Sequence, residues 1–146
     1  LVGSEMCIRD SVIKKAKSYV DGGESENHRK IKNIIASNPN LIEINDKHFS
    51  PHIEYILPSM DTIDILFKSP KKWIGVEVKP ASSADDDILR GLYQCVKYQA
   101  LIEAHLAVLG EHKDVKVILA IGGEFPNELI PVKNILGVEV IDKIIA

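Results

Sequence analysis

Residues 62–79 have the sequence TIDILFKSPKKWIGVEVK, in which two apolar stretches flank a polar segment. Apolar residues recur at every second position of 62–68 and again of 73–79, which is the period of a β-strand with two different faces. The segment 69–72, Ser-Pro-Lys-Lys, has the composition of a turn. We therefore predict a β-hairpin with strands at 62–68 and 73–79.

The register of this hairpin decides which side chains meet. If it closes about the Pro70–Lys71 bond without a bulge, facing residues have numbers that sum to 141. Asp64 then lies opposite Glu77, and the two-residue period puts Lys79 on the same side of its strand as Glu77. Two carboxylates and one ammonium group are expected to converge on one face of the sheet.

Such a cluster is typical of a metal site. Opposed like charges destabilise a sheet, and a partly buried pair of carboxylates raises one pKa or requires a cation. Mg²⁺ takes one or two carboxylates together with waters and substrate phosphate, and it makes water a better nucleophile. Lys79 could orient that water or offset developing negative charge. The alternative is a solvated strand edge, since Glu-x-Lys is common, and Asp64 in register favours the functional interpretation.

The rest of the chain predicts an α/β protein. Its patterns indicate helices at 12–20, 24–37, 86–109 and 126–136, and strands at 52–57, 114–121 and 138–144. Leu89, Leu92, Val96 and Ala100 mark the expected buried stripe of the long helix. The stretch 114–121 is apolar and β-branched, so we expect it to be buried on both faces.

The bulk composition fits one globular domain of 146 residues, which we place at 12–146. Residues 1–11 (LVGSEMCIRDS) have no clear period and resemble translated adapter sequence, so we expect a non-native or unstructured segment there, and Cys7 with it. Cys95 lies in a helical apolar pattern and is expected to be a buried, reduced thiol. No secretory signal is recognisable and no apolar run approaches the ~20 residues of a membrane span, which favours a soluble, cytoplasmic protein without a membrane partner.

The net charge of −3 argues against a nucleic-acid partner, because phosphate binders usually carry a basic surface. It does not exclude one. Carboxylates of a metal site are balanced only when the metal is bound, and a basic stripe can coexist with this total.

The hairpin sequence resembles the PD-(D/E)XK nuclease superfamily. Asp64-Ile65-Leu66-Phe67 is similar to the family's second motif and Val76-Glu77-Val78-Lys79 to its third, although Ile63 stands where a proline commonly precedes the aspartate. The resemblance covers residues 24–121. It implies a restriction-endonuclease-like core of helix, three strands, helix and strand, followed here by a helix–strand extension. It also implies Asp64, Glu77 and the Val78 carbonyl as ligands of Mg²⁺ or Mn²⁺, with Lys79 catalytic.

One branch of the superfamily carries Gln-x-x-x-Tyr on the following helix, and here this helix reads Gln94-Cys95-Val96-Lys97-Tyr98. Residues four apart share a helix face, which also includes Arg90. The resemblance implies that Gln94 lies near the attacking water and that Arg90 and Tyr98 bind substrate. The alternative is that Gln94 and Tyr98 simply border the core.

The family's first helix often supplies a further glutamate to the metal site. Glu24 and Glu26 are both candidates, and Glu24 is favoured because it is in phase with His28 and the apolar face of the predicted helix. His28 is either a partner of the metal ligands or a structural residue.

Three other acidic features are lesser candidates. Asp61 is expected to cap the turn before Asp64, and the register of Glu54 cannot be deduced from the sequence. Asp85-Asp86-Asp87 is better explained by the dipole at a helix start than by a metal.

Together these features predict a metal-dependent nuclease, a hydrolase of phosphodiester bonds in DNA. Because no recognition domain is evident, specificity would require a homodimer or a partner protein. Two alternatives stay open: a catalytically inactive nuclease-fold subunit that binds DNA or joins a complex, and a metalloenzyme acting on a small phosphate ester.

Overall fold

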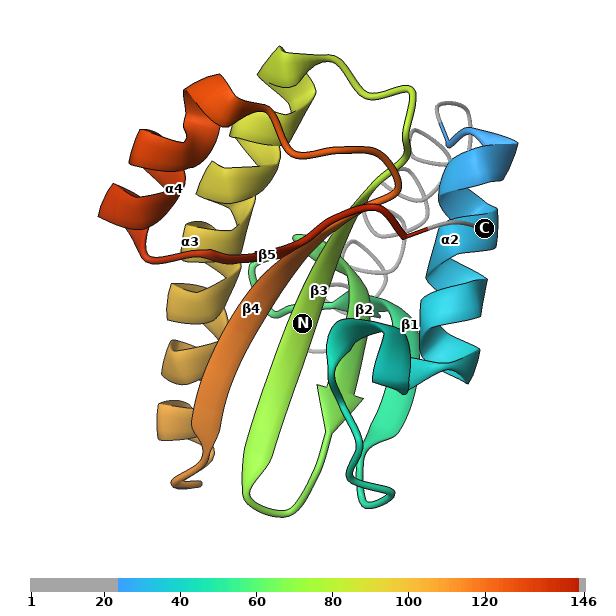
Figure 1. Ribbon diagram of the computed structural model, residues 1–146. Helices are drawn as coiled ribbons and strands as arrows, with labels where there is room; N and C mark the ends of the chain where they lie inside the picture. The colour runs from blue at the N-terminus through green and yellow to red at the C-terminus, as the bar shows by residue number, and fades with distance from the viewer. Residues whose placement is uncertain (1–23, 145–146) are drawn as a thin grey trace, which may run out of the picture.

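The computed structural model describes residues 24–144, which form a mixed sheet between helices (Figure 1). The helices are α2 (Glu26–Ser37), α3 (Asp85–Val108) and α4 (Ile130–Leu136), with 3₁₀ turns η1 (Pro39–Ile42) and η2 (Asn127–Leu129). The strands are β1 (Ser50–Ile56), β2 (Thr62–Lys68), β3 (Lys72–Lys79), β4 (Asp114–Ile121) and β5 (Glu139–Ile141). The predicted α/β class is confirmed. The helix expected at 12–20, the segment 1–11 and Cys7 lie outside the described residues.

The sheet has the order β1-β2-β3-β4-β5. β1, β2 and β3 are antiparallel neighbours, whereas β3 pairs with β4, and β4 with β5, in parallel. A parallel pair needs a crossover connection, and the long helix α3 provides it between β3 and β4. Figure 1 shows α2 on one face of the sheet and α3 with α4 on the other.

The hairpin register agrees with the prediction. Four pairs join β2 to β3, from Lys68 with Trp73 to Ile65 with Val76, and each sums to 141. This pairing ends one position short of Asp64 and Glu77. Beyond it, the Asp64 side chain replaces a backbone partner, because the Val78 N–H donates to its Oδ2 at 2.8 Å.

Hydrophobic side chains are buried on both faces of the sheet. One cluster, which includes Leu66, Leu92 and Ile102, lies under α3, and the other, which includes Ile35 and Val76, lies under α2. β4 is buried from Val117 to Ile121, as expected for a strand between two neighbours and two helix layers. This packing holds the strand ends that carry the acidic residues in fixed positions.

The buried stripe of α3 differs from the predicted one. Of the four expected residues only Leu92 is fully buried, and Val96 is 40% exposed. The stripe consists of Ile88, Gly91, Leu92, Cys95, Tyr98, Ile102 and Leu106. Apolar residues occur all round this helix, so their spacing does not define one phase. Cys95 is a buried free cysteine, as predicted.

Several element boundaries also differ, among them those of the first strand, which was expected at 52–57 and is found at Ser50–Ile56. α2 begins at Glu26 rather than at residue 24, because Ser25 is its N-cap and accepts a hydrogen bond from the His28 N–H at 3.1 Å. The segment 126–136 divides into η2 and α4, with a proline in the first turn of α4. The last strand is limited to Glu139–Ile141. In residues 24–144, no helix has both the length and the apolar character needed to cross a membrane.

Candidate functional site

Glu77 and Lys79 lie at the end of β3 and face α3. Glu77 is 5% exposed, and its Oε1 lies 3.4 Å from the Lys79 Nζ. The stem of Lys79 passes close to α3, since its Cε is only 3.1 Å from the position that a Cβ would take on Gly91. A side chain on Gly91 would therefore displace this ammonium group.

Asp64, on β2, is close enough to Glu77 for their charges to interact. Burial raises the pKa of Glu77 to about 8, with the negative charge of Asp64 adding to the rise and Lys79 opposing it. Two carboxylates in a partly closed site cannot both ionise without a cation. The sequence prediction that these three groups converge agrees with this geometry.

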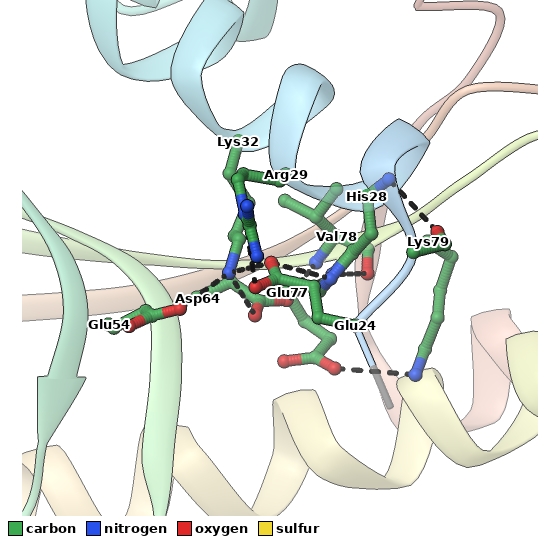
Figure 2. Close-up of polar contacts among 10 residues, drawn as sticks. Glu24, His28, Arg29, Lys32, Glu54, Asp64, Glu77, Val78 and Lys79 are labelled. Carbon is green, nitrogen blue, oxygen red and sulfur yellow. Dashed lines mark hydrogen bonds and ion pairs between the residues drawn. The ribbon is translucent and has the colours of Figure 1, made fainter. Parts of the chain in front are cut away.

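The His28 ring joins Asp64 to the main chain of β3 (Figure 2). Its Nε2 lies 2.9 Å from the Val78 carbonyl oxygen and 3.3 Å from Asp64 Oδ2. A carbonyl only accepts, so Nε2 must carry the proton. The pKa of His28 is raised: burial opposes protonation, but the hydrogen bond and charge of Asp64 outweigh it. One nitrogen thus bridges two of the predicted metal-binding oxygens.

Glu24, immediately before the N-cap of α2, lies inside this network. Its side chain is 3% exposed and contacts His28 Nδ1 at 3.1 Å as well as the ammonium group of Lys32. Glu26 points to solvent, with a side chain 80% exposed that pairs with Lys30. Of the two candidate glutamates, therefore, Glu24 is the one beside Asp64, although it is not helical as predicted.

Lys32 is a site residue that the sequence prediction missed. It is 2% exposed, and its Nζ contacts Glu24, Glu54 Oε1 at 3.1 Å and Asp64 Oδ1 at 3.9 Å (Figure 2). Its position one turn after His28 was an available signal. Glu54, whose register could not be deduced, lies between residues of β1 that pair with both neighbours of Asp64.

The three polar residues of α3 are in different environments. Arg90 has a side chain 66% exposed that pairs with Asp87. Gln94 has an enclosed Oε1 that makes no hydrogen bond within the described part of the chain. Tyr98 is 6% exposed and packed in the core, where burial and then the charge of Glu77 raise its pKa. This burial is what the alternative interpretation of Tyr98 expects, and its role in substrate binding stays a prediction.

A pocket of about 170 Å³ opens beside the acidic cluster. It is lined by residues that precede or belong to α2, by the end of β3 and by the first turns of α3, among them His28, Val78, Lys79 and Arg90. The lining contains the basic side chains of Lys79 and Arg90 and also the carboxylate of Asp87, which pairs with Arg90.

The lesser candidates have structural partners. Asp61 pairs with Lys97 at 2.7 Å and accepts from the Ser59 hydroxyl at 2.7 Å. Asp85-Asp86-Asp87 forms the first turn of α3. Among residues 24–144, no set of three His, Cys, Asp or Glu side chains is arranged to hold a metal by itself. A metal here would need the main chain or water as well as the carboxylates.

Fold and site together define an α/β protein with a buried acid–lysine cluster at the end of its central hairpin. The chain matches no family model, and no curated protein matches it.

Proposed function

We propose that this chain is a divalent-metal-dependent nuclease of the PD-(D/E)XK type, with a restriction-endonuclease-like core, that hydrolyses phosphodiester bonds in DNA. The observation that carries the proposal is the convergence of Asp64, Glu77, the Val78 carbonyl and Lys79 at one strand end. The order of one helix, three strands, a helix and a strand supports it. DNA is preferred as the substrate because members of the superfamily mostly act on DNA.

The residues fit Mg²⁺ or Mn²⁺. The donors are carboxylate and carbonyl oxygens, which hard cations prefer. Asp64 Oδ2 and the Val78 oxygen already accept one proton-bearing nitrogen between them, so both can face a single cation. Asp64, Glu77 and Val78 would hold the ion, with Glu24 adjacent. When bound, the ion supplies polarisation of the phosphodiester and acidification of a water.

Side chains of the protein would orient the water, stabilise the developing charge and bind the substrate phosphate. Lys79, beside Glu77 Oε1, is placed to orient the attacking water and to offset the charge that develops on the phosphate. Arg90 lines the neighbouring pocket and would bind a substrate phosphate. The enclosed oxygen of Gln94, which makes no hydrogen bond among residues 24–144, would accept one from water.

Plasmid nicking in Mg²⁺ or Mn²⁺ tests the proposal. We expect Glu77→Ala and Lys79→Ala each to reduce the nicking rate by about 10²-fold or more, because each removes a group that acts on the charge of the transition state. Lys97→Ala is the control, since its ammonium group pairs with Asp61 outside the cluster. Equal residual nicking by wild type and both variants would overturn the proposal.

A catalytically inactive DNA-binding or complex subunit is the second candidate. It is favoured by the ion pairs of His28 and Lys32, which balance Asp64 without a metal. Binding of a labelled duplex with no nicking above the level in EDTA would support this candidate instead.

A further inference from the structure

Lys68, at the end of β2, is a partly exposed cation that forms no ion pair within residues 24–144. Its Nζ donates a hydrogen bond to the Tyr55 hydroxyl at 3.1 Å. It also lies 4.3 Å from the centre of the Tyr55 ring and 4.5 Å from that of Trp73. An ammonium group has three N–H donors, and the described residues supply one oxygen acceptor. The group therefore keeps its charge and hydrogen-bonding capacity for an anion.

A row of rings surrounds this ammonium group. The His52 and Trp73 rings each meet the Tyr55 ring edge-on, with centroid distances of 6.1 and 6.4 Å, and the His105 ring lies 6.2 Å from that of Trp73. Trp73 is 6% exposed and anchors the row, whereas His52 is exposed to solvent. We call His52, Tyr55, Lys68, Trp73 and His105 the aromatic–cation surface.

A small apolar cavity of about 230 Å³ adjoins this surface. It is lined by residues of the turn after β1 and of the last turns of α3, and it shares His105 with the row of rings. Cavities that hold a whole small molecule usually measure about 300–1,000 Å³. This cavity would therefore take only part of a ligand, such as one ring system.

These features suit an unpaired strand of nucleic acid. Proteins that bind single strands combine positive charge along the phosphates with aromatic side chains on which the bases stack, and His rings serve in this role as well. The sequence 68–72, Lys-Ser-Pro-Lys-Lys, contains three lysines and no carboxylate, which complements a phosphate chain. The bases of a duplex are already stacked on one another, so they offer the rings no free face.

We propose that the aromatic–cation surface binds an unpaired nucleic-acid strand, with a phosphate on Lys68, one base stacked on His52 and a neighbouring base at the cavity beside His105. The inference goes beyond the proposed function and does not rest on it. Lys68 is four residues from Asp64 on β2, or about 13 Å at the usual rise of a strand. These residues therefore bind a strand and take no part in its cleavage.

Fluorescence anisotropy of a labelled oligothymidylate, with the full chain in EDTA, tests this inference. Lys68→Met should lower the affinity severalfold and make the slope of log affinity against log salt shallower by about 0.7, because one phosphate contact with a single strand is lost. His52→Ala should weaken binding roughly fivefold or more through the loss of one stacked base. Lys68→Arg should bind as wild type does, since a guanidinium keeps the charge and stacks on aromatic rings.

Lys133→Met is the matched control. Lys133 is also a partly exposed lysine without an ion pair in the described part of the chain, and it lies on α4, at the side of the sheet away from β1 (Figure 1). His52 is exposed, so His52→Ala keeps the test decisive if Lys68→Met is unstable. Wild-type affinity for oligothymidylate in both Lys68→Met and His52→Ala, or no binding by wild type, would overturn the inference.

Duplex DNA and oligouridylate in parallel titrations define the partner. Neither substitution should change the affinity for duplex, and an equal loss for duplex and oligothymidylate would contradict the requirement for an unpaired strand. Oligouridylate binding with the same sensitivity to both substitutions would support the inference and include RNA. No bond is cleaved in EDTA, so a failure of plasmid nicking would count against the nuclease proposal and leave this inference standing.

Discussion

At the scale of single residues, the properties of the site depend on the ionisation of the Glu77 carboxyl group. Its side chain is nearly sealed from solvent, so burial disfavours the charged form, and Asp64 disfavours it further. Lys79 offsets only part of this effect. Burial and the charge of Asp64 therefore favour the protonated form of Glu77 in the metal-free protein, and a cation that binds there must compete with that proton.

The raised pKa of Glu77 predicts how stability changes with pH in EDTA. The unfolded chain loses this proton near pH 4.5 and the folded chain near pH 8. The folded state therefore binds more protons between these values, and stability should fall as pH rises from about 4.5 to 8. Asp64, Lys79, Cys95 and Tyr98 face the same carboxyl group from β2, β3 and α3, and His28, whose pKa is also raised, shifts stability in the same direction.

Glu77→Gln isolates the contribution of this carboxyl group. The neutral amide cannot ionise, so the variant should be more stable than wild type at pH 8 in EDTA and less active in Mg²⁺. Thermal unfolding from pH 5 to pH 8 measures the first effect. If the two proteins lose stability in parallel over this window, Glu77 is not the group responsible.

The residues of the site differ in how far the sequence could predict them. Asp64, Glu77 and Lys79 follow from a period of two and from one register assumption, both of which depend only on local sequence. Lys32 and Glu54 follow neither from the strand period nor from the hairpin register. Lys32 is a charged residue buried by tertiary ion pairs, and no sequence signal predicts the left-handed backbone of Glu54.

At the scale of elements, α3 fixes Lys79 through a glycine. A Cβ on Gly91 would lie 2.9 Å from a methyl group of Leu119 and 3.1 Å from Lys79 Cε. Gly91→Ala should lower the nicking rate about tenfold by displacing the ammonium group. The new Cβ also crowds Leu119, but alanine favours a helix over glycine by about 1 kcal/mol. These two effects oppose each other, so the free energy of unfolding should change little.

Ala100→Gly provides the control for this helix. The position is exposed on α3, so the change should lower the unfolding free energy by roughly 1 kcal/mol and leave the nicking rate unaltered. Nicking at the wild-type rate by Gly91→Ala would show that the close approach of α3 does not position Lys79.

Strands were predicted more accurately than helix faces. The bounds of β2 and β4 agree with the sequence prediction, because each has a clear pattern between turn residues. The phase of α3 was wrong, since apolar residues such as Val96 and Val108 lie on its solvent side. The end of β5 was also misplaced, because the length of that strand is set by its parallel pairing with β4 rather than by its own apolar residues.

At the scale of the whole molecule, the architecture brings the ends of several helices and strands to one place. The pairing of β2 with β3 stops beside Asp64, while the starts of α2 and α3 flank the end of β3 and form the pocket there. A pocket of about 170 Å³ holds little more than one phosphate group with its waters. Under the proposed function, one substrate phosphate would occupy this pocket.

This geometry predicts a shallow salt dependence of DNA binding. The described cations that line the pocket are Lys79, Arg90 and, when protonated, His28. Two or three phosphate contacts give a slope of roughly −2 to −3 in a plot of log affinity against log salt. Affinity should then fall roughly 15- to 60-fold between about 50 and 200 mM KCl, far less than the 10³-fold or more of a protein with six to ten contacts.

Fluorescence anisotropy of a labelled duplex with the Glu77→Gln variant in EDTA measures this slope without cleavage. Arg90→Ala should make the slope shallower by about one unit, because each neutralised phosphate contributes about 0.9. Lys71→Ala is the control, since Lys71 lies in the turn at the opposite end of the β2–β3 hairpin. A slope steeper than about −5, or one that Arg90→Ala leaves unchanged, would mean that DNA binds a different surface and that the net charge of −3 conceals a basic region elsewhere.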